Sequence, residues 1–449
     1  MSRLDRVRIG CGAGFADDRI EPAVELAERG RLNYLVFECL AERTVALAQR
    51  AKLNDPDAGY NEWLADRMEA VLEPCARQGV KIITNMGAAN PRAAARAVAE
   101  IARRKGLTGL KIAAVTGDDV LDHVRGTDLP LLERPVTLSA LGDTVISANA
   151  YTGIDGILAA LRQDADIVIG GRIADPALFL APLVHEFGWS TADWRLMGTG
   201  TAVGHLLECA AHVTGGYFAD PGVKEVPDLA RLGFPLAEVD ADGSFSITKV
   251  EGSGGRVTVA TVTEQLLYEV HDPAAYFTPD VVADFSGARL EQVGDDRVAV
   301  RGISGHSRPG TLKVSVGYVD SFIGEGEISY AGPNSVARGR LALDIVRQRL
   351  PLIGVPTTET RFDLIGVDAV HRGAGVSATG DPGEVRIRVV ARTDSMAQAR
   401  RVGHEVVALW LNGPCGGGGA TRNAYEDIAV VSVFLDRNLI SPTVILEES

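Results

Sequence analysis

The stretch that decides the fold is Val7-Arg8-Ile9-Gly10-Cys11-Gly12-Ala13-Gly14, a short apolar run that passes into a glycine-rich segment. A helical pattern follows over residues 18–29, and a second apolar run, Tyr34-Leu35-Val36-Phe37, comes next. Near-continuous apolar strands that alternate with helices are typical of a parallel sheet covered on both faces. The opening of the chain therefore predicts an α/β fold.

The same alternation continues to about residue 225, which predicts an N-terminal α/β domain over residues 1–225 with a doubly wound, mostly parallel sheet. Further strands are expected at residues 80–83, 111–115, 144–147 and 166–172. Right-handed crossovers bring the carboxyl ends of parallel strands to one edge of the sheet, where ligands bind. Candidates for one shared site follow these strands, and they are Gly10, Gly12, Gly14, Glu38, Asn85, Asp118 and Arg172.

From residue 226 onward the pattern changes to alternating strands joined by polar turns. Antiparallel strands are expected at residues 256–262, 312–319, 384–392 and 428–434, with helices near 333–350 and 396–411. This pattern predicts a C-terminal α+β domain over residues 226–449. We expect a ligand site where the two domains meet, because pockets commonly form there.

The composition limits the partners of the chain. Its 449 residues include 59 acidic and 45 basic ones, so the formal net charge is −14. Nucleic acids and anionic membranes are bound by clustered Lys and Arg, so we expect neither as a partner. The five cysteines contain no C-x-x-C pair, and no apolar run is long enough to span a bilayer. We therefore expect a cytoplasmic protein in a reducing compartment.

Gly10-x-Gly12-x-Gly14 joins the first expected strand to the first expected helix. Glycine lets a ligand approach the backbone closely, and free N–H groups at a helix start favour an anion such as a phosphate or carboxylate. The alternative is a tight turn without a ligand. The spacing is not the G-x-G-x-x-G fingerprint, so no nicotinamide cofactor is expected. The chain has no Met-Lys-Met biotin site, so no biotin is expected either.

Gly170-Gly171-Arg172, followed by Asp175 and Pro176, is the second strand-end motif. Arg172 can hold a carboxylate through two parallel hydrogen bonds, and the two glycines would let the substrate come close. The alternative is a local ion pair between Arg172 and Asp175.

His205, Glu208 and His212 are spaced to share one face of a helix. They could hold a divalent metal, or Glu208 could orient His205 as a general base. A polar helix face at a domain junction would give the same pattern.

Glu325 and Glu327 lie two residues apart on an expected strand and therefore point the same way. They could share a proton or a divalent cation, whereas a solvated strand face is the alternative. After the last expected helix come Asn412-Gly413-Pro414-Cys415 and four glycines. Gly416, Gly417 and Gly418 are expected in a loop whose N–H groups bind an anion, and the alternative is a flexible linker.

Five stretches spread over essentially the whole chain carry a resemblance to a known family. They are residues 10–18, 170–177, 204–216, 324–333 and 412–419. These stretches resemble the acyclic terpene utilisation protein A (AtuA) family. The resemblance implies a role in the degradation of branched terpenoid acids through acyl-CoA intermediates, without catalytic residues that could be carried over. Some relatives carry a further C-terminal segment, which we expect to be a separate small partner protein here.

We therefore expect an enzyme with lyase-, hydratase- or isomerase-like chemistry on small or branched carboxylic acids or their acyl-CoA thioesters. Glu38, Asp118 or His205 would be the base that removes a proton beside a carbonyl, with Glu208, Glu325 and Glu327 as further catalytic candidates. Arg172 and the glycine segments would hold the anionic substrate, with Asn85 and Asp175 as further ligand-binding candidates. The alternative is a non-catalytic subunit that binds acyl-CoA or organises a carboxylase-type complex. A homo-oligomer is expected in either case.

Overall fold

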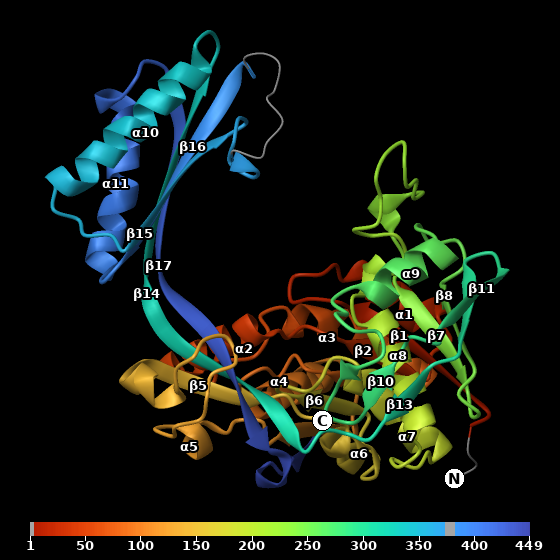
Figure 1. Ribbon diagram of the computed structural model, residues 1–449. Helices are drawn as coiled ribbons and strands as arrows, with labels where there is room; N and C mark the ends of the chain where they lie inside the picture. Colours follow the sequence, from red (N-terminus) through yellow and green to blue (C-terminus); the bar gives the residue numbers. More distant parts are fainter. Residues whose placement is uncertain (1–3, 373–381) are drawn as a thin grey trace. The chain divides into compact units, whose positions relative to one another are not determined.

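The computed structural model describes residues 4–372 and 382–449 and divides into two compact units (Figure 1). Unit 1 comprises residues 1–317 and 430–449, and unit 2 comprises residues 318–429. This division differs from the boundary at residue 225 that the change of sequence pattern suggests, because the chain after residue 225 adds strands to the first sheet.

A ten-stranded mixed sheet forms the centre of unit 1. Its parallel part has the order β1-β2-β3-β6-β4, and four of these strands lie where the apolar runs predict them. The parallel strands are β1 (Arg6–Ala13), β2 (Tyr34–Phe37), β3 (Lys81–Thr84), β6 (Ile167–Gly170) and β4 (Lys111–Thr116). Strand β6 is shorter than expected, because it ends at Gly170 and leaves Gly171 and Arg172 in the loop that follows.

Antiparallel strands extend this sheet at both edges. Beside β1 they are β7 (Pro235–Asp240), β8 (Phe245–Lys249), β12 (Arg297–Arg301) and β11 (Arg289–Gly294). Beside β4 lies β18 (Thr443–Glu448). A small separate sheet consists of β13 (Ser304–His306), β10 (Val282–Asp284) and β9 (Tyr276–Phe277). The mixed α/β class is confirmed.

The doubly wound layout is not confirmed. Strands β1, β2 and β3 follow one another across the sheet, and only the return from β4 to β6 reverses the direction. The strand expected at residues 144–147 is β5 (Val145–Ala150), which pairs with β14 (Thr311–Ala331) and not with the central sheet. The strand expected at residues 256–262 is wrong, because helix α9 (Val259–Leu267) begins there behind a Thr258 cap.

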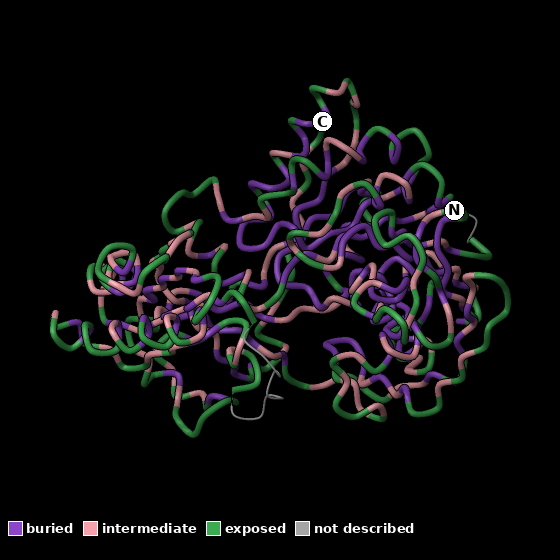
Figure 2. Tube along the Cα trace, turned by 90° about the horizontal axis from the view of Figure 1, so that it is seen from above, coloured by how far each residue is buried: buried purple, intermediate pink, exposed green. Residues whose placement is uncertain are grey.

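Helices cover the parallel strands from both sides (Figure 1). Helices α1, α3 and α4 pack against one another, and α6 and α7 form another group. The helices of unit 1 are α1 (Glu21–Arg29), α2 (Glu42–Asn54), α3 (Leu64–Gln78), α4 (Pro91–Arg104), α5 (Leu121–Val124), α6 (Asp155–Leu161), α7 (Ala177–Phe187), α8 (Trp194–Leu207) and α9. Figure 2 shows the buried segments that run between these layers.

Unit 2 is an antiparallel sheet with two helices on one face (Figure 1). The strand order is β15 (Glu359–Ile365), β16 (Glu384–Thr393), β14 and β17 (Gly417–Asp436), and the helices are α10 (Ser335–Leu352) and α11 (Met396–Asn412). Strands β14 and β17 each cross the boundary between the units. Alternate residues of β16 are buried against the helices, as the period of two in its sequence predicts.

Glycines let α11 lie close to β14 in unit 2. A Cβ at Gly324 would lie 2.1 Å from the Ala399 backbone oxygen, and one at Gly326 would lie 2.6 Å from the Val406 side chain. Packing therefore explains these two glycines of the family-like stretch. Among the described residues, no helix combines the length and apolar character that crossing a bilayer requires.

Candidate functional site

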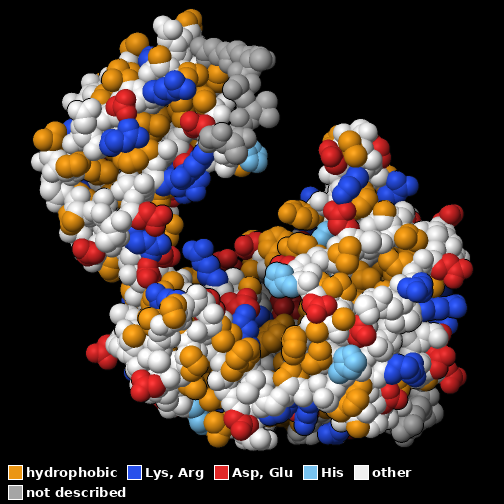
Figure 3. Space-filling model, viewed as in Figure 1, with side chains coloured by type: hydrophobic (Ala, Val, Ile, Leu, Met, Phe, Trp, Pro, Cys, Tyr) orange, Lys and Arg blue, Asp and Glu red, His pale blue; other side chains and the backbone are white. Residues whose placement is uncertain are grey.

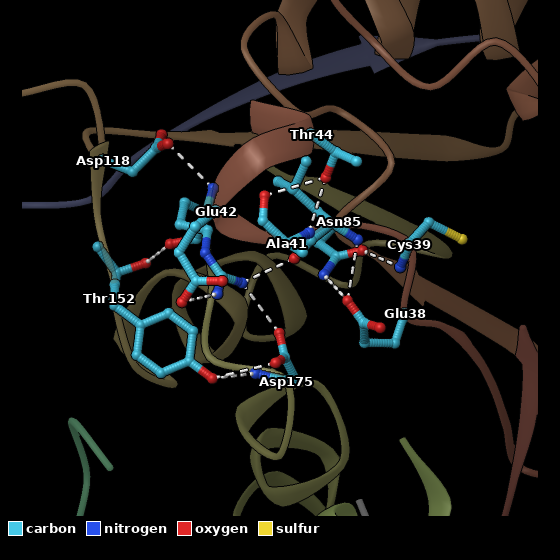
Figure 4. A network of polar contacts seen from close by, with 12 residues as sticks. Glu38, Cys39, Ala41, Glu42, Thr44, Asn85, Asp118, Thr152 and Asp175 are labelled. Carbon is cyan, nitrogen blue, oxygen red and sulfur yellow. Dashed lines mark hydrogen bonds and ion pairs between the residues drawn. The ribbon is translucent and has the colours of Figure 1, made fainter. Parts of the chain in front are cut away.

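Polar side chains gather where the parallel strands of unit 1 end (Figure 4). Glu38 follows β2, Asn85 follows β3, Asp118 follows β4 and Arg172 follows β6. Asn85 bonds to Glu38, and the Asp118 carboxylate accepts the backbone N–H of Arg172. The structure thus brings these four residues to one edge of the sheet, as the strand topology predicts.

Arg172 is the buried cation at the centre of this edge, with 3% of its side chain exposed. Its Nη1 donates to the Leu40 carbonyl at 2.8 Å and to Asp175 Oδ1 at 3.0 Å. Its Nη2 lies 3.4 Å from Glu42 Oε1. The local ion pair with Asp175 is therefore observed, whereas the role of Arg172 as a clamp for a substrate carboxylate stays a prediction. Its Nε is buried without a hydrogen-bond partner.

Asp175 is fixed by Tyr151 as well as by Arg172. The Tyr151 hydroxyl donates to Asp175 Oδ2 at 3.2 Å and accepts the Asp175 backbone N–H at 3.1 Å. The Tyr151 ring lies under the guanidinium of Arg172, 4.3 Å from ring centre to Cζ. Burial raises the pKa of Asp175 and Arg172 opposes this rise. Asp175 is therefore a rigidly held carboxyl beside a permanent cation.

Glu42, the first residue of α2, carries the second negative charge beside Arg172. It also pairs with Lys313 of β14, whose Nζ lies 3.3 Å from Glu42 Oε1. Burial alone would raise the pKa of Glu42, but Arg172 and Lys313 outweigh burial and lower it to about 2. Glu42 is therefore ionised at neutral pH.

The carboxylate of Asp118 is held by hydrogen bonds from other groups of the protein. Its Oδ2 accepts from Asn149 Nδ2 and from the Arg172 backbone N–H, both at 2.9 Å. A Cβ at Gly171 would lie 2.6 Å from the Asp118 carboxylate, so this carboxylate fills the space that the glycine leaves open. Burial raises the pKa of Asp118, and the two hydrogen bonds oppose the rise. Asp118 positions the loop that carries Arg172.

Glu38 shares one oxygen between two donors. Its Oε1 accepts from the Leu40 backbone N–H and from Asn85 Nδ2, both at 2.9 Å. The other end of the Asn85 amide accepts from the Cys39 backbone at 2.7 Å. Burial, and then the charge of Asp175, raise the pKa of Glu38 well above its ordinary value.

His205 and Glu208 form a buried pair at the end of α8. His205 Nδ1 lies 3.0 Å from Glu208 Oε1, and His205 Nε2 lies 3.2 Å from the Leu266 carbonyl oxygen. A carbonyl oxygen only accepts, so Nε2 carries a proton. Burial lowers the pKa of His205 to about 4, whereas burial and then Asp175 raise the pKa of Glu208 well above its ordinary value. A neutral imidazole therefore accepts at Nδ1 from a protonated Glu208.

An aromatic wall stands beside this pair. Tyr276 and Phe285 pack on the His205 ring with ring centres 5.0 and 5.6 Å away. Burial raises the pKa of Tyr276 well above its ordinary value. Figure 3 shows acidic, basic and histidine side chains together in a hollow of unit 1. We name five carboxyls and their two cations the acid cluster; its members are Glu38, Glu42, Asp118, Asp175, Glu208, Arg172 and Lys313.

The glycines of the opening stretch have packing roles in the structure. Gly10 and Gly12 lie inside β1 and not in a loop. A Cβ at Gly10 would meet Leu32 at 2.8 Å, one at Gly12 would meet the Phe37 ring at 2.6 Å, and one at Gly14 would meet the Cys209 backbone at 2.5 Å. The expectation that this segment is an open anion-binding loop is therefore not supported.

Glu325 and Glu327 belong to unit 2 and point to the sheet face away from α10 and α11. Glu325 pairs with Arg388, and Glu327 Oε2 accepts from Arg386 Nε at 2.5 Å. Arg388 Nε also lies 3.7 Å from Glu327 Oε1, so the two carboxylates share an arginine. We name this surface the charged sheet face; it comprises Asp320, Glu325, Glu327, Glu359, Arg361, Asp363, Arg386, Arg388, Arg392 and Asp427.

The glycine run after α11 is the start of a strand and not a loop. Gly416 has a φ of +73° and ends the turn, and β17 begins at Gly417. A Cβ at Gly417 would lie 2.9 Å from Ile328 and 3.2 Å from the Tyr330 ring, whereas one at Gly418 would meet nothing within 4 Å. Gly416 suits the turn and Gly417 suits the packing, so the expected nest of N–H groups is not seen.

No metal arrangement is found among the described residues: no group of three or more His, Cys, Asp or Glu side chains is placed to hold an ion. Both ring nitrogens of His205 already have partners. The ring of His212 packs edge-on against Tyr217 and Tyr268. The helix-face spacing of His205, Glu208 and His212 thus gives a hydrogen-bonded pair and a separate aromatic contact.

Several residues of the site were not predicted. Glu42 lies four residues after Glu38, so a wider search of the strand ends would have found it. Tyr151 follows β5 and would also have been found in this way. Lys313 and Tyr276 come from distant strands, and no local pattern marks them.

The fold and the candidate site together define an α/β protein with a carboxyl-rich site at the strand ends of a mixed sheet. The family model described as acyclic terpene utilisation family protein AtuA matches residues 7–446, and the chain belongs to this family. No curated protein and no solved structure matches the chain.

Proposed function

We propose that unit 1 is an acid–base enzyme that acts on the carbon beside the carbonyl of a small or branched acyl thioester. The observation that carries the proposal is the acid cluster, in which five carboxyls surround two cations at the strand-end edge. Perturbed titratable groups that lie together at such an edge are typical of active sites.

The charge balance selects the substrate end that enters the site. Arg172 is paired with Asp175 and Glu42, and Lys313 is paired with Glu42, so each cation of the cluster already faces a carboxylate. A neutral carbonyl, as in a thioester, enters without adding charge to the excess of carboxyls. We therefore give Arg172 no direct contact with an anionic group of the substrate.

We assign different roles to the carboxyls from their contacts. Asp175 bonds directly to the Arg172 guanidinium, which favours its carboxylate form, so it is our base for the proton beside the carbonyl. Glu208, whose pKa is raised well above its ordinary value, is the acid, and the proton that it donates to His205 Nδ1 passes to the carbonyl oxygen. One proton leaves carbon and one reaches oxygen, so the product of this step is a neutral enol. Isomerases, hydratases and lyases of acyl thioesters share this step.

The test is exchange of the proton beside the carbonyl in D2O. The full chain is incubated with the coenzyme A thioester of 3-methylbutanoic acid, and deuterium incorporation is followed by mass spectrometry. We expect exchange with the parent and a loss of about 100-fold or more in Asp175→Asn, as general-base removal gives. Glu208→Gln should reduce the rate while the protein stays folded.

Glu327→Gln on the charged sheet face is the matched control and should keep the parental rate. The proposal fails if the parent gives no exchange with straight and branched thioesters, or if Asp175→Asn exchanges as fast as the parent.

One observation favours the alternative of a non-catalytic subunit. Trp410 and Leu411 at the end of α11 leave 59% and 92% of their surface exposed, as a protein-binding surface does. A binding subunit would take up the thioester without exchange, so the same experiment separates the two functions.

A further inference from the structure

Unit 1 contains a cavity that is separate from the acid cluster. Its volume is about 710 Å³, within the range of sites for small organic ligands. Its walls come from α9 and from the two loops before it, and they include Phe218, Lys224, Arg256, Leu267 and Tyr268.

Helix α9 lies between the cavity and the acid cluster, and a different face of the helix is turned to each. Ala260, Thr263, Glu264 and Leu267 have the spacing of one helix face and line the cavity. Gln265 and Leu266 lie on the other face, where Gln265 Nε2 donates to the His205 carbonyl at 2.7 Å. The cavity is therefore a second site and not an extension of the first.

Large apolar side chains form part of the cavity lining. Leu267 is 56% exposed and Val223 is 75% exposed, although both are large hydrophobic residues. Phe218 and Tyr268 add two aromatic surfaces. Large apolar groups left in contact with water at a concave surface are typical of a site for an apolar ligand part.

Arg256 supplies a cation for the other part of the ligand. Its Nη1 donates to the Glu225 carbonyl at 2.9 Å, and it forms no ion pair within residues 4–372 and 382–449. The second cation, Lys224, is satisfied by Glu264 at 2.7 Å and by the Phe218 ring at 4.6 Å. The carboxyl of Glu225 accepts from the Gly222 backbone at 2.7 Å. Arg256 is thus the cation that remains for an anionic group.

The length of the cavity wall matches that of a hydrocarbon chain of medium length. Thr258 caps α9 and Leu267, nine residues further on, ends it, which corresponds to roughly 13 Å at the helical rise of 1.5 Å per residue. Arg256 precedes the start of this wall and Leu267 ends it. We infer that the cavity binds an amphipathic monoanion, with its carboxylate at Arg256 and its apolar chain along α9 toward Leu267 and Tyr268. This site goes beyond the proposed function and requires no turnover.

Calorimetric titration of the full chain with decanoate tests the inference, and decanol serves as the uncharged probe of equal length. We expect decanoate to bind about ten-fold more tightly than decanol, because a charge-assisted hydrogen bond distinguishes them. Arg256→Gln should remove this difference. Leu267→Gln should weaken the binding of both probes by about ten-fold or more. Arg231→Gln is the control, because Arg231 is an exposed arginine paired with Asp228, and it should bind like the parent.

Three results would overturn the inference. The parent could fail to bind decanoate at millimolar concentration, or it could bind decanoate and decanol equally well. The third result is a Leu267→Gln variant that binds both probes as tightly as the parent does. Thermal unfolding of each variant shows that the protein is folded, so a loss of binding is not a loss of structure. Because Asp175→Asn leaves this cavity unchanged, decanoate binding and deuterium exchange fail independently.

Discussion

The acid cluster of unit 1 and the charged sheet face of unit 2 use the same residue types in different surroundings. On the charged sheet face, side chains such as Glu325, Glu327 and Arg388 keep about a fifth to a third of their surface exposed, and each carboxylate has an arginine. In the acid cluster, by contrast, Arg172 is 3% exposed. Burial of the arginine, and not residue type, distinguishes the candidate active site.

Removing the central arginine of each region should give the largest difference. Arg172→Met leaves Asp175 and Glu42 without their buried partner, and we expect a loss of about 3–5 kcal/mol in the free energy of unfolding. Arg388→Met removes a partly exposed cation and should lose about 1 kcal/mol or less. Urea unfolding of both variants measures the losses. Equal losses would show that burial does not separate the two regions.

Glycine substitution compares the packing of the two units. In Gly14→Ala the new Cβ would lie 2.5 Å from the Cys209 backbone, so we expect a loss of about 1–3 kcal/mol from overpacking. In Gly418→Ala the new Cβ meets nothing within 4 Å, and the change should stay within about 0.5 kcal/mol. Urea unfolding again gives both values. A neutral Gly14→Ala would reopen the anion-binding interpretation of the opening stretch.

The pH dependence of stability distinguishes the protonation states of two carboxyls within the acid cluster. Burial and Asp175 raise the folded pKa of Glu208, so its proton stabilises the fold below the unfolded pKa of about 4.3, and this contribution is lost as pH rises toward the folded pKa. The difference in unfolding free energy between the parent and Glu208→Gln should therefore fall above pH 4.3, by at most about 1.4 kcal/mol per pH unit.

Glu42 is the matched control with the opposite sign. Its folded pKa is lowered to about 2, so its contribution is present above pH 4.3 and is lost as pH falls toward 2. Urea titrations between pH 4.5 and pH 8 should show a constant difference between the parent and Glu42→Gln. A falling difference for Glu42→Gln, or a constant one for Glu208→Gln, would contradict the assigned protonation states.

The smallest effect is expected on the charged sheet face. Glu327→Gln removes a pair with Arg386 that is open to solvent, and the loss should be below about 1 kcal/mol. Added salt at about 1 M should remove most of this loss, because exposed pairs are screened. A larger loss that does not depend on salt would assign Glu327 a role that the present geometry does not give it.

The parallel strands and the residues at their ends could be predicted from the sequence. Apolar runs such as Tyr34–Phe37 form buried parallel strands, and the topology then fixes where Glu38 and Arg172 meet. What these residues bond to was not predictable. The pair between Arg172 and Asp175 was an open alternative, because spacing does not determine whether a guanidinium is already occupied.

The pairing of distant strands could not be predicted. Strands β7 and β8 read as the start of a second domain, because alternation of apolar and polar residues shows a strand but not its neighbour. Residues 256–262 contain the β-branched residues of a strand, yet Thr258 caps a helix there and accepts from the Thr261 backbone at 3.2 Å. The glycine-rich segments indicate ligand contacts in the sequence, because a sequence cannot distinguish room for a ligand from room for a neighbouring side chain.

The pairing of β18 with β4 has a consequence for synthesis on the ribosome. Thr116 of β4 bonds to Thr443 of β18, 327 positions further along the chain. The outer edge of β4 therefore stays unpaired while unit 2 is translated and folds, and an unpaired edge is open to other strands. At roughly 5–20 residues per second this interval lasts between about 15 s and about one minute. The nascent chain thus has a period of exposure during which a chaperone would protect it from aggregation.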